Sequence, residues 1–294
     1  MRNFDPKTSN KLLTKDMKPK FFLTLISSIF ILTACSQTGN NNFNAKKGRI
    51  KFETCYGYEA AEKKGESPKD TLTTKATFQY DEKGNMLSAN HYDLKTNMVF
   101  SSDKRVYDDR GNMLEILHYN NAGEVISKDI YKYDDKNNEI EKDNYWKGKL
   151  NGKVISDYDY KSMIVTVSFY NGDGRFERKH HYKIDDKGNQ LENYDWQGTL
   201  TSKSRFEYND NGKVIKQYSE AWEMDTTNSV IDYKYDEWNN EIMRTITDLN
   251  TNSVSSIKTE YTYDKFGNWI KKVTTWSCLD SRKTDRREIE YYEN

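Results

Sequence analysis

The sequence predicts an all-β protein of antiparallel β-hairpin repeats, about eight units of 24–28 residues that form a long, curled, spiralling meander sheet. Three observations predict this fold. A turn motif of the type Tyr-Asp-x-x-Gly-Asn recurs along the chain, aromatic residues lie two positions apart just before it, and no proline follows Pro68. Residues two apart share one face of a strand, and proline cannot donate to a β-ladder. This punctuation excludes a helical fold.

Composition supports half-buried strands. The 294 residues are 35% hydrophobic and 31% charged, yet aromatic residues reach 14% and 22 of them are tyrosines. Disordered chains lack aromatic residues. A tyrosine ring can cover apolar surface while its hydroxyl stays in water, which suits a sheet. The 46 basic and 46 acidic residues cancel, so the whole chain has no electrostatic preference for nucleic acid.

Residues 1–34 predict a lipoprotein-type signal peptide. Two lysines precede an apolar run over residues 21–32, and small residues follow it. The run is too short to span a membrane as a mature helix, and its flanks are those of a secretory signal. Met17 opens a more typical signal than Met1 does, so the true start stays open between them.

The end of this segment, Leu32-Thr33-Ala34-Cys35, resembles a lipobox, the bacterial signal for attaching lipid to a cysteine and cutting before it. The resemblance implies a mature chain that begins at a lipidated Cys35 and is anchored in the cell envelope. Ser36 implies the outer membrane, with the periplasmic or surface face left open. The alternative is an ordinary secretory signal with a chance cysteine.

Residues 35–49 are polar and rich in asparagine, which predicts a flexible tether before a β domain over residues 50–294. Lipidation of Cys35 leaves Cys55 and Cys278. An exported pair can form a disulfide, but the two lie at opposite ends of the repeats and would need Cα atoms within roughly 7 Å. Two unpaired thiols are favoured, and the pairing stays open.

The repeat is explained by turn chemistry. The chain reads FQYDEKGNML from Phe78 and RVYDDRGNML from Arg105, and similar segments follow. The Asp can cap its own turn, and Gly accepts the left-handed conformation that ends a tight hairpin with a bulge. Asn is the next residue to tolerate positive φ. The predicted turn-forming residues are Gly84, Gly111, Asn137, Gly188, Gly212, Asn239 and Gly267. The residues that anchor the units before these turns are Tyr80, Tyr107, Tyr133, Tyr160, Ile184, Tyr208, Tyr235 and Tyr263.

A second turn in each unit completes the hairpins. Two turns per 26 or so residues leave strands of about eight residues. Sixteen or more strands rarely stay flat, so we expect an open, spiralling trough or a partial barrel. An outer-membrane barrel is disfavoured because the strands carry Lys, Asp and Glu throughout. The second-turn positions are Asn97, Gly123, Gly148, Gly174, Gly198, Asn228 and Asn252.

The motif Tyr-Asp-x-x-Gly-Asn-x-Leu resembles the YD repeat of the Rhs family, which is also found in teneurins and wall-associated proteins. The resemblance covers about residues 72–294. It implies hairpins that wind into a spiral sheet and an association with carbohydrate binding. Large relatives enclose a toxin and end in a proline-rich, self-cleaving segment, which nothing here matches.

Reactive constellations are sparse. His91 and His118 are 27 residues apart and are expected to repeat one structural position rather than bind a metal. The aspartates of the turns lack the spacing of calcium loops. The acidic pairs Asp108-Asp109 and Asp185-Asp186 suggest glycosidase carboxylates, but in so charged a chain they are expected by chance. No cofactor or metal is predicted.

The aromatic residues two positions apart predict an aromatic ladder along one face of the sheet. The best candidate ligand-binding residues are aromatic residues outside this ladder. Trp238 and Phe266 occupy turn tips where other units carry Lys or Arg, and Trp269 follows closely. Trp146 and Trp196 lie near second turns. Flat aromatic faces suit sugars or apolar partners. The alternative is that a neighbouring loop or the chain terminus covers them.

These features predict a non-catalytic, envelope-anchored lipoprotein whose repeat sheet serves as a binding or scaffold surface. The expected partners are the membrane, through lipid on Cys35, and an envelope glycan or a protein. One alternative is an enzyme that acts on polysaccharide, suggested by the acidic pairs. The other is a purely structural surface-interaction module, favoured if the tip aromatic residues are buried.

Overall fold

A computed structural model describes residues 49–61, 69–186, 188–194, 198–221, 228–279 and 281–293. The predicted signal peptide, Cys35 and the tether up to residue 48 lie outside this part. Within it, no helix has the length and apolarity needed to cross a membrane. The strands are β1 (Ile50–Ala61), β2 (Thr71–Tyr80), β3 (Met86–Tyr92), β4 (Val99–Tyr107), β5 (Met113–Asn120), β6 (Val125–Tyr133), β7 (Glu139–Trp146), β8 (Lys149–Asp159), β9 (Ile164–Asn171), β10 (Phe176–Ile184), β11 (Gln190–Tyr194), β12 (Leu200–Tyr208), β13 (Val214–Ala221), β14 (Ser229–Tyr235), β15 (Glu241–Asp248), β16 (Val254–Tyr263), β17 (Trp269–Trp276) and β18 (Ser281–Tyr291).

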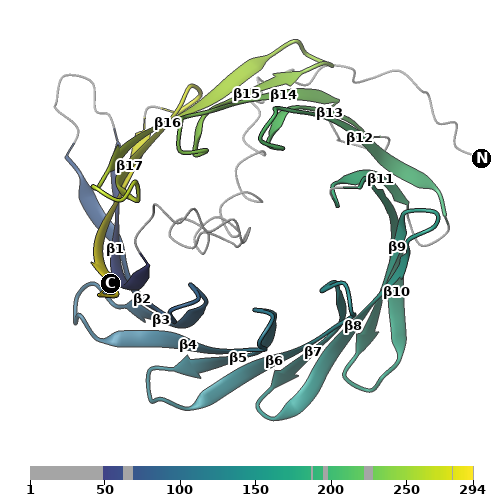
Figure 1. The fold of residues 1–294 in the computed structure, drawn as a ribbon, viewed down its shortest axis with the longest axis horizontal. Coiled ribbons are helices and arrows are strands. Elements are labelled where there is room, and N and C mark those ends of the chain that lie inside the picture. The colour runs from purple at the N-terminus through teal and green to yellow at the C-terminus, as the bar shows by residue number, and fades with distance from the viewer. Residues whose placement is uncertain are drawn as a thin grey trace, which may run out of the picture. The chain divides into compact units, whose positions relative to one another are not determined.

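The strands form one antiparallel sheet that closes into an 18-stranded barrel (Figure 1). Each strand pairs with its neighbours in the chain, and β1 pairs with both β2 and β18. The prediction of an antiparallel hairpin meander is confirmed. The expectation of an open, spiralling sheet is wrong, because β1 lies between the first and last repeat strands and satisfies the hydrogen-bonding edges of both.

The predicted turn residues adopt the left-handed conformation. At Gly84 φ is 87° and at Asn137 it is 66°, and the other five YD-turn positions are also positive. The turn after Asp159 lacks the Gly or Asn of the motif, and Met163 takes the left-handed position there with φ of 57°. A register shift follows each regular turn, at Val106/Tyr107 for example, as expected for a bulge. Six of the second-turn positions also have positive φ: Asn97, Gly123, Gly148, Gly174, Gly198 and Asn252.

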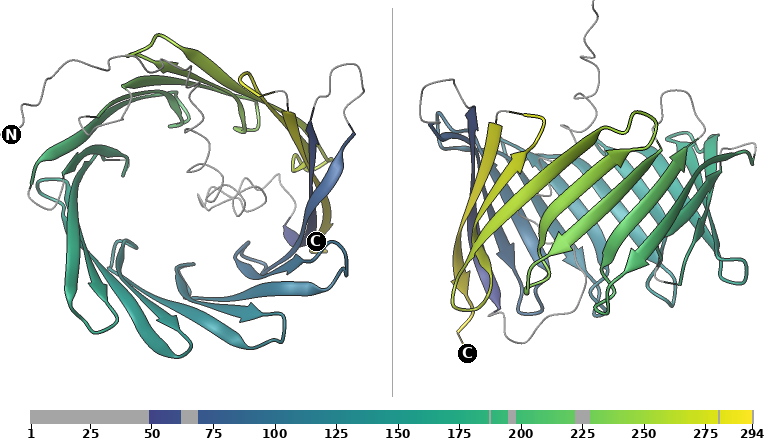
Figure 2. Two further views of the ribbon diagram at one scale, coloured as in Figure 1. Left: turned by 180° about the vertical axis from the view of Figure 1, so that it is seen from behind. Right: turned by 90° about the horizontal axis from the view of Figure 1, so that it is seen from above.

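All YD turns lie at one end of the barrel and bend toward its axis, whereas the second turns flare outward at the other end (Figures 1 and 2). The hydroxyl of Tyr160 donates to Asp134 in the preceding YD turn, so the anchor side chain lies on the face toward which the turns bend. We call this face the inner wall and the opposite face the outer wall. Directly paired residues on adjacent strands share a face, so the strand register assigns the residues of the other strands to one wall or the other.

The inner wall carries most of the buried side chains. Phe78, Ala89, Ile116 and Val165 are at most 7% exposed and share the face of the anchor residues. Intervening outer-wall positions such as Lys132 are exposed. Barrels of about eight strands can be filled by their own side chains, and wider barrels enclose a lumen. The predicted aromatic ladder therefore lines the inner wall as a single layer.

The closing seam is held by a buried ion pair. Glu53 on β1 is fully buried and accepts two hydrogen bonds from the guanidinium of Arg287 on β18, one of them at 2.8 Å. The hydroxyl of Tyr80 on β2 donates to the other carboxylate oxygen at 2.6 Å. Trp269 packs against the guanidinium, with 4.4 Å from its ring centroid to the central carbon. One carboxylate thus joins the three strands that close the barrel.

The two cysteines of the β domain do not form a disulfide. Cys55 is buried on β1 and faces the inner wall beside the seam, whereas Cys278 is exposed in the turn between β17 and β18. Closure of the barrel therefore brings the two ends of the array together through strand pairing and the Glu53–Arg287 ion pair.

The substitution Glu53→Gln is expected to destabilise the barrel by about 3 kcal/mol, because removing one partner leaves a buried charge uncompensated. Urea unfolding at neutral pH measures the loss. The matched control is Glu290→Gln, which breaks the exposed 2.8 Å pair with Lys51 on the same two strands and should cost far less, because solvent screens that pair. Equal losses in the two variants would contradict a role for burial.

Candidate functional site

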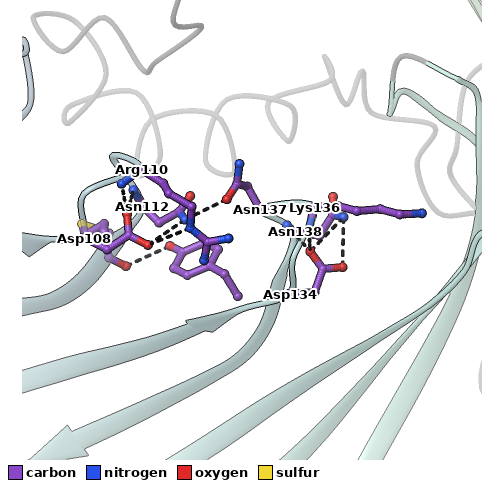
Figure 3. A network of polar contacts seen from close by, with 9 residues as sticks. Asp108, Arg110, Asn112, Asp134, Lys136, Asn137 and Asn138 are labelled. Carbon is purple, nitrogen blue, oxygen red and sulfur yellow. Dashed lines mark hydrogen bonds and ion pairs between the residues drawn. The ribbon is translucent and has the colours of Figure 1, made fainter.

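The YD turns are tied to one another by side chains (Figure 3). In one turn, Oδ1 of Asp134 accepts hydrogen bonds from the backbone N–H groups of Lys136 and Asn138, both at 2.8 Å. The hydroxyl of Tyr160, from the next unit, donates to the other oxygen of Asp134 and accepts from Nδ2 of Asn138 at 2.5 Å. Tyr208, Tyr263 and Tyr291 make the same contacts with the turns before them.

The asparagine of the motif is a functional position that sequence reasoning missed. It donates from its backbone to the turn Asp and from its side chain to the next unit, as Asn138, Asn189, Asn240 and Asn268 show. Its recurrence right after six of the seven predicted left-handed positions was the available signal. The contact links turns from separate hairpins, so turn geometry alone does not reveal it.

This bonding occupies one carboxylate of each acidic pair that suggested an enzyme. The Tyr160 hydroxyl and the turn amides lower the pKa of Asp134 to about 2. Partial burial acts to raise the pKa of Asp108, but hydrogen bonds from Asn112 and Arg110 outweigh it and leave the pKa below its ordinary value. Asp185 likewise caps its turn through Asn189 at 2.7 Å. An ionised, fully bonded carboxylate is poorly suited to act as a general acid.

Three predicted ligand-binding aromatic residues pack within the barrel instead of forming one exposed platform. Trp269 is only 6% exposed, beneath Arg287. Trp238 is half-buried against Gly267 and lies 5.8 Å from the ring of Tyr263.

Phe266 is half-buried and lies 4.6 Å from the ring of Tyr291. Both turn-tip rings therefore cover the unit that follows, as the alternative interpretation anticipated. Of the two weaker candidates, Trp146 is 50% exposed at the end of β7, and Trp196 lies outside the described residues.

The inner wall also carries a row of hydrogen-bonded polar side chains, which we call the polar belt. Nδ1 of His118 donates to Asp103 at 2.7 Å, and the guanidinium of Arg105 lies 3.6 Å from the other oxygen of Asp103. One strand further on, the two oxygens of Asp129 contact Asn144 at 2.6 Å and Lys142 at 3.1 Å. The belt consists of Asp103, Arg105, His118, Asp129, Lys142 and Asn144, on strands β4 to β7.

The belt distinguishes two histidines that the repeat makes equivalent. The hydrogen bond to Asp103 raises the pKa of His118, whereas burial lowers the pKa of His91 despite the nearby Asp103. Sequence reasoning found the equivalence but not the belt. Its partners lie about 15 residues apart on adjacent strands and meet only once the register is fixed.

The outer wall carries cross-strand ion pairs at mid-strand positions. Glu141 lies 2.7 Å from Lys132 and 2.9 Å from Lys153, and Lys153 lies 3.1 Å from Asp143. Further round the barrel, Lys203 pairs with Glu192 at 3.3 Å. Among the described residues, no group of three or more His, Cys, Asp or Glu side chains could hold a metal ion.

No protein-family model matches the chain. No curated protein matches it either. Among solved structures, a porin-like protein from Bacteroides uniformis is 11% identical, with 83% of this chain and 98% of that chain covered and a TM-score of 0.43. A putative outer membrane lipoprotein-sorting protein domain from Vibrio parahaemolyticus is 7% identical, with 85% and 90% covered and a TM-score of 0.31. The Tc holotoxin pore of Photorhabdus luminescens is 12% identical, with 78% and 15% covered and a TM-score of 0.22.

Titration of the imidazole signals by NMR should give a midpoint above 6.5 for His118 and below 6.5 for His91. The stability that protonated His118 contributes is then fully present below pH 6.5 and lost as pH rises through its raised pKa. Protonation of His91 has the opposite effect on stability. Because burial lowers its pKa, acidification forces a charge onto a buried ring and destabilises the fold. The substitution Asp103→Asn should lower the His118 midpoint; an unchanged midpoint would show that Asp103 is not the cause.

Proposed function

We propose that this chain is a lipoprotein of the bacterial outer membrane, anchored through Cys35, whose barrel stands beside the bilayer and binds a polar ligand on its inner wall without catalysing a reaction. The membrane anchor rests on the resemblance of residues 32–35 to a lipobox. The binding role rests on the polar belt and the tyrosines that surround it.

The outer wall supports a barrel held beside the bilayer. A strand that faces lipid presents a continuous apolar band, and charged side chains near the bilayer midplane are strongly destabilising. Lys132, Glu141 and Lys153 instead form a chain of ion pairs across β6, β7 and β8. A covalent lipid therefore supplies the membrane attachment that the barrel wall does not favour.

The observation that carries the binding role is the polar belt itself. Hydrogen bonds to neighbouring side chains hold its donors and acceptors in place. Several of these groups stay partly exposed on the inner wall, and a third of the His118 side chain is accessible. Tyr131 lies beside the belt with its hydroxyl 3.4 Å from Asp129. Fixed polar groups beside aromatic rings suit a carbohydrate, which offers hydroxyls at its edges and C–H groups on its faces.

The packing of Trp269 and the two turn-tip rings favours a second candidate, a purely structural scaffold that presents its surface to a protein partner. The polysaccharide-acting enzyme is less well supported, because Asp108 and Asp185 are bonded within their turns. The two remaining candidates differ in whether the inner wall has a ligand.

The anchor is tested by growth with labelled palmitate followed by detergent phase partition. The natural chain should incorporate the label and enter the detergent phase, and Cys35→Ala should not be labelled. Residues 36–294, exported behind an ordinary cleavable signal, contain every strand of the barrel and should enter the aqueous phase because the outer wall is charged. Recovery of this unlipidated form in the detergent phase would favour an embedded barrel.

Carbohydrate binding is tested with the same lipid-free chain on an array of bacterial envelope glycans. The substitution Lys142→Met removes a belt cation, and loss of one charged hydrogen bond, worth about 1.5–3 kcal/mol, should weaken binding at least about tenfold. The matched control Lys132→Met removes a lysine from the outer wall of the adjacent strand and should leave binding unchanged. Equal effects in both variants, or no bound glycan, would leave the scaffold role.

A further inference from the structure

The exposed apolar side chains gather at one end of the barrel. We call the end formed by the outward-flaring second turns the second-turn rim and the opposite end the YD rim (Figure 2). At the second-turn rim, Met98 is 68% exposed and Val254 is 64% exposed. Phe100, Trp146, Phe176 and Leu249 are each about half exposed there. At the YD rim, Val106 is the only large apolar residue of the described part that reaches 50%.

These residues surround the barrel instead of forming a single patch. Met98 and Phe100 belong to the β3–β4 hairpin, Phe176 to β9–β10 and Val254 to β15–β16, and these hairpins lie on different sides of the ring in Figure 1. Because these side chains encircle one end of the barrel, a single flat surface that lies perpendicular to the barrel axis can contact all of them.

The YD rim has the opposite character. In six of its turns an exposed acidic residue directly follows the capping position, whereas Tyr160 and Lys265 hold that place in two others, and in the first turns a basic residue comes next. Each of these turns thus carries two acids and one base, a net negative charge. Anionic lipid would be repelled from this end. The exposed acids are Glu82, Asp109, Asp135, Asp186, Asp210 and Glu237.

We propose that the second-turn rim rests on a phospholipid bilayer, with its apolar side chains inserted into the interface. The inference rests on the proposed function, because lipid on Cys35 confines the barrel to the membrane surface. Tryptophan, phenylalanine and flanking lysines such as Lys147 and Lys149 are the residues that favour such an interface. The acidic YD rim faces away from the bilayer.

The chain between Cys35 and the barrel is long enough for this orientation. β1 begins at the YD rim, so a lipid at the second-turn rim requires residues 36–49 to reach at least the height of the barrel. Residues 36–49 can span at most about 50 Å at roughly 3.6 Å per residue. A strand of 11 residues such as β18 is about 36 Å long at roughly 3.3 Å per residue, and its tilt shortens its height along the axis.

The test uses residues 36–294 without lipid and vesicles of phosphatidylethanolamine and phosphatidylglycerol in a 3:1 ratio. Cosedimentation should show binding of the unaltered chain, and Met98→Asp and Phe176→Asp should each weaken it at least about tenfold. The matched control is Val106→Asp at the YD rim, where the native side chain is as exposed as that of Trp146. It should leave vesicle binding unchanged.

Failure of this inference and failure of the anchor give different results, because the assay contains no lipidated protein. Absence of vesicle binding by the unaltered chain would overturn the inference even if Cys35 incorporates palmitate. Equal weakening by Val106→Asp would overturn it as well. Sedimentation velocity without vesicles adds a third outcome: a dimer that Phe176→Asp dissociates, with no vesicle binding, would assign the rim to a second copy.

Discussion

The pairing of β1 with both β2 and β18 is the constraint on which the rest of the barrel depends. The other strand pairs join neighbours in the chain, but Ile50 and Tyr291 come from the two ends of the β domain. Closing so long a loop costs conformational entropy. The β1–β18 ladder and the contacts of Glu53 with Arg287 and Tyr80 offset that cost. Burial makes this carboxylate selective for its partners, since an unpaired charge there is strongly unfavourable.

Closure gives the two faces of the sheet different roles. On the inner wall, anchor tyrosines reach back to the preceding turn and bind successive hairpins together. The same face holds the polar belt, where Asp103 and Asp129 collect partners from adjacent strands. The outer wall carries ion pairs such as Lys132–Glu141. An open sheet would expose both faces equally, so the contrast between lumen and surroundings follows from the seam.

The two rims differ for a related reason. In most YD turns, hydrogen bonds fix an Asp, a left-handed Gly or Asn and a following Asn, which leaves the tip residues freer to vary. Most of those tips carry acidic and basic residues, whereas Trp238 and Phe266 pack on the next unit. The second turns carry fewer such contacts between hairpins. Their side chains are freer to vary, and several of them are apolar and exposed.

The sequence by itself determined the turns, the strands and the repeat, because positive φ is a local requirement that only Gly and Asn meet readily. Gly111 and Asn137 could be identified from their neighbours alone. The tertiary structure decided closure, since β1 lacks the motif and its partners lie far away in the chain. It also decided that Trp269 is buried and that His118 meets Asp103, because such contacts depend on register and on which strands become neighbours.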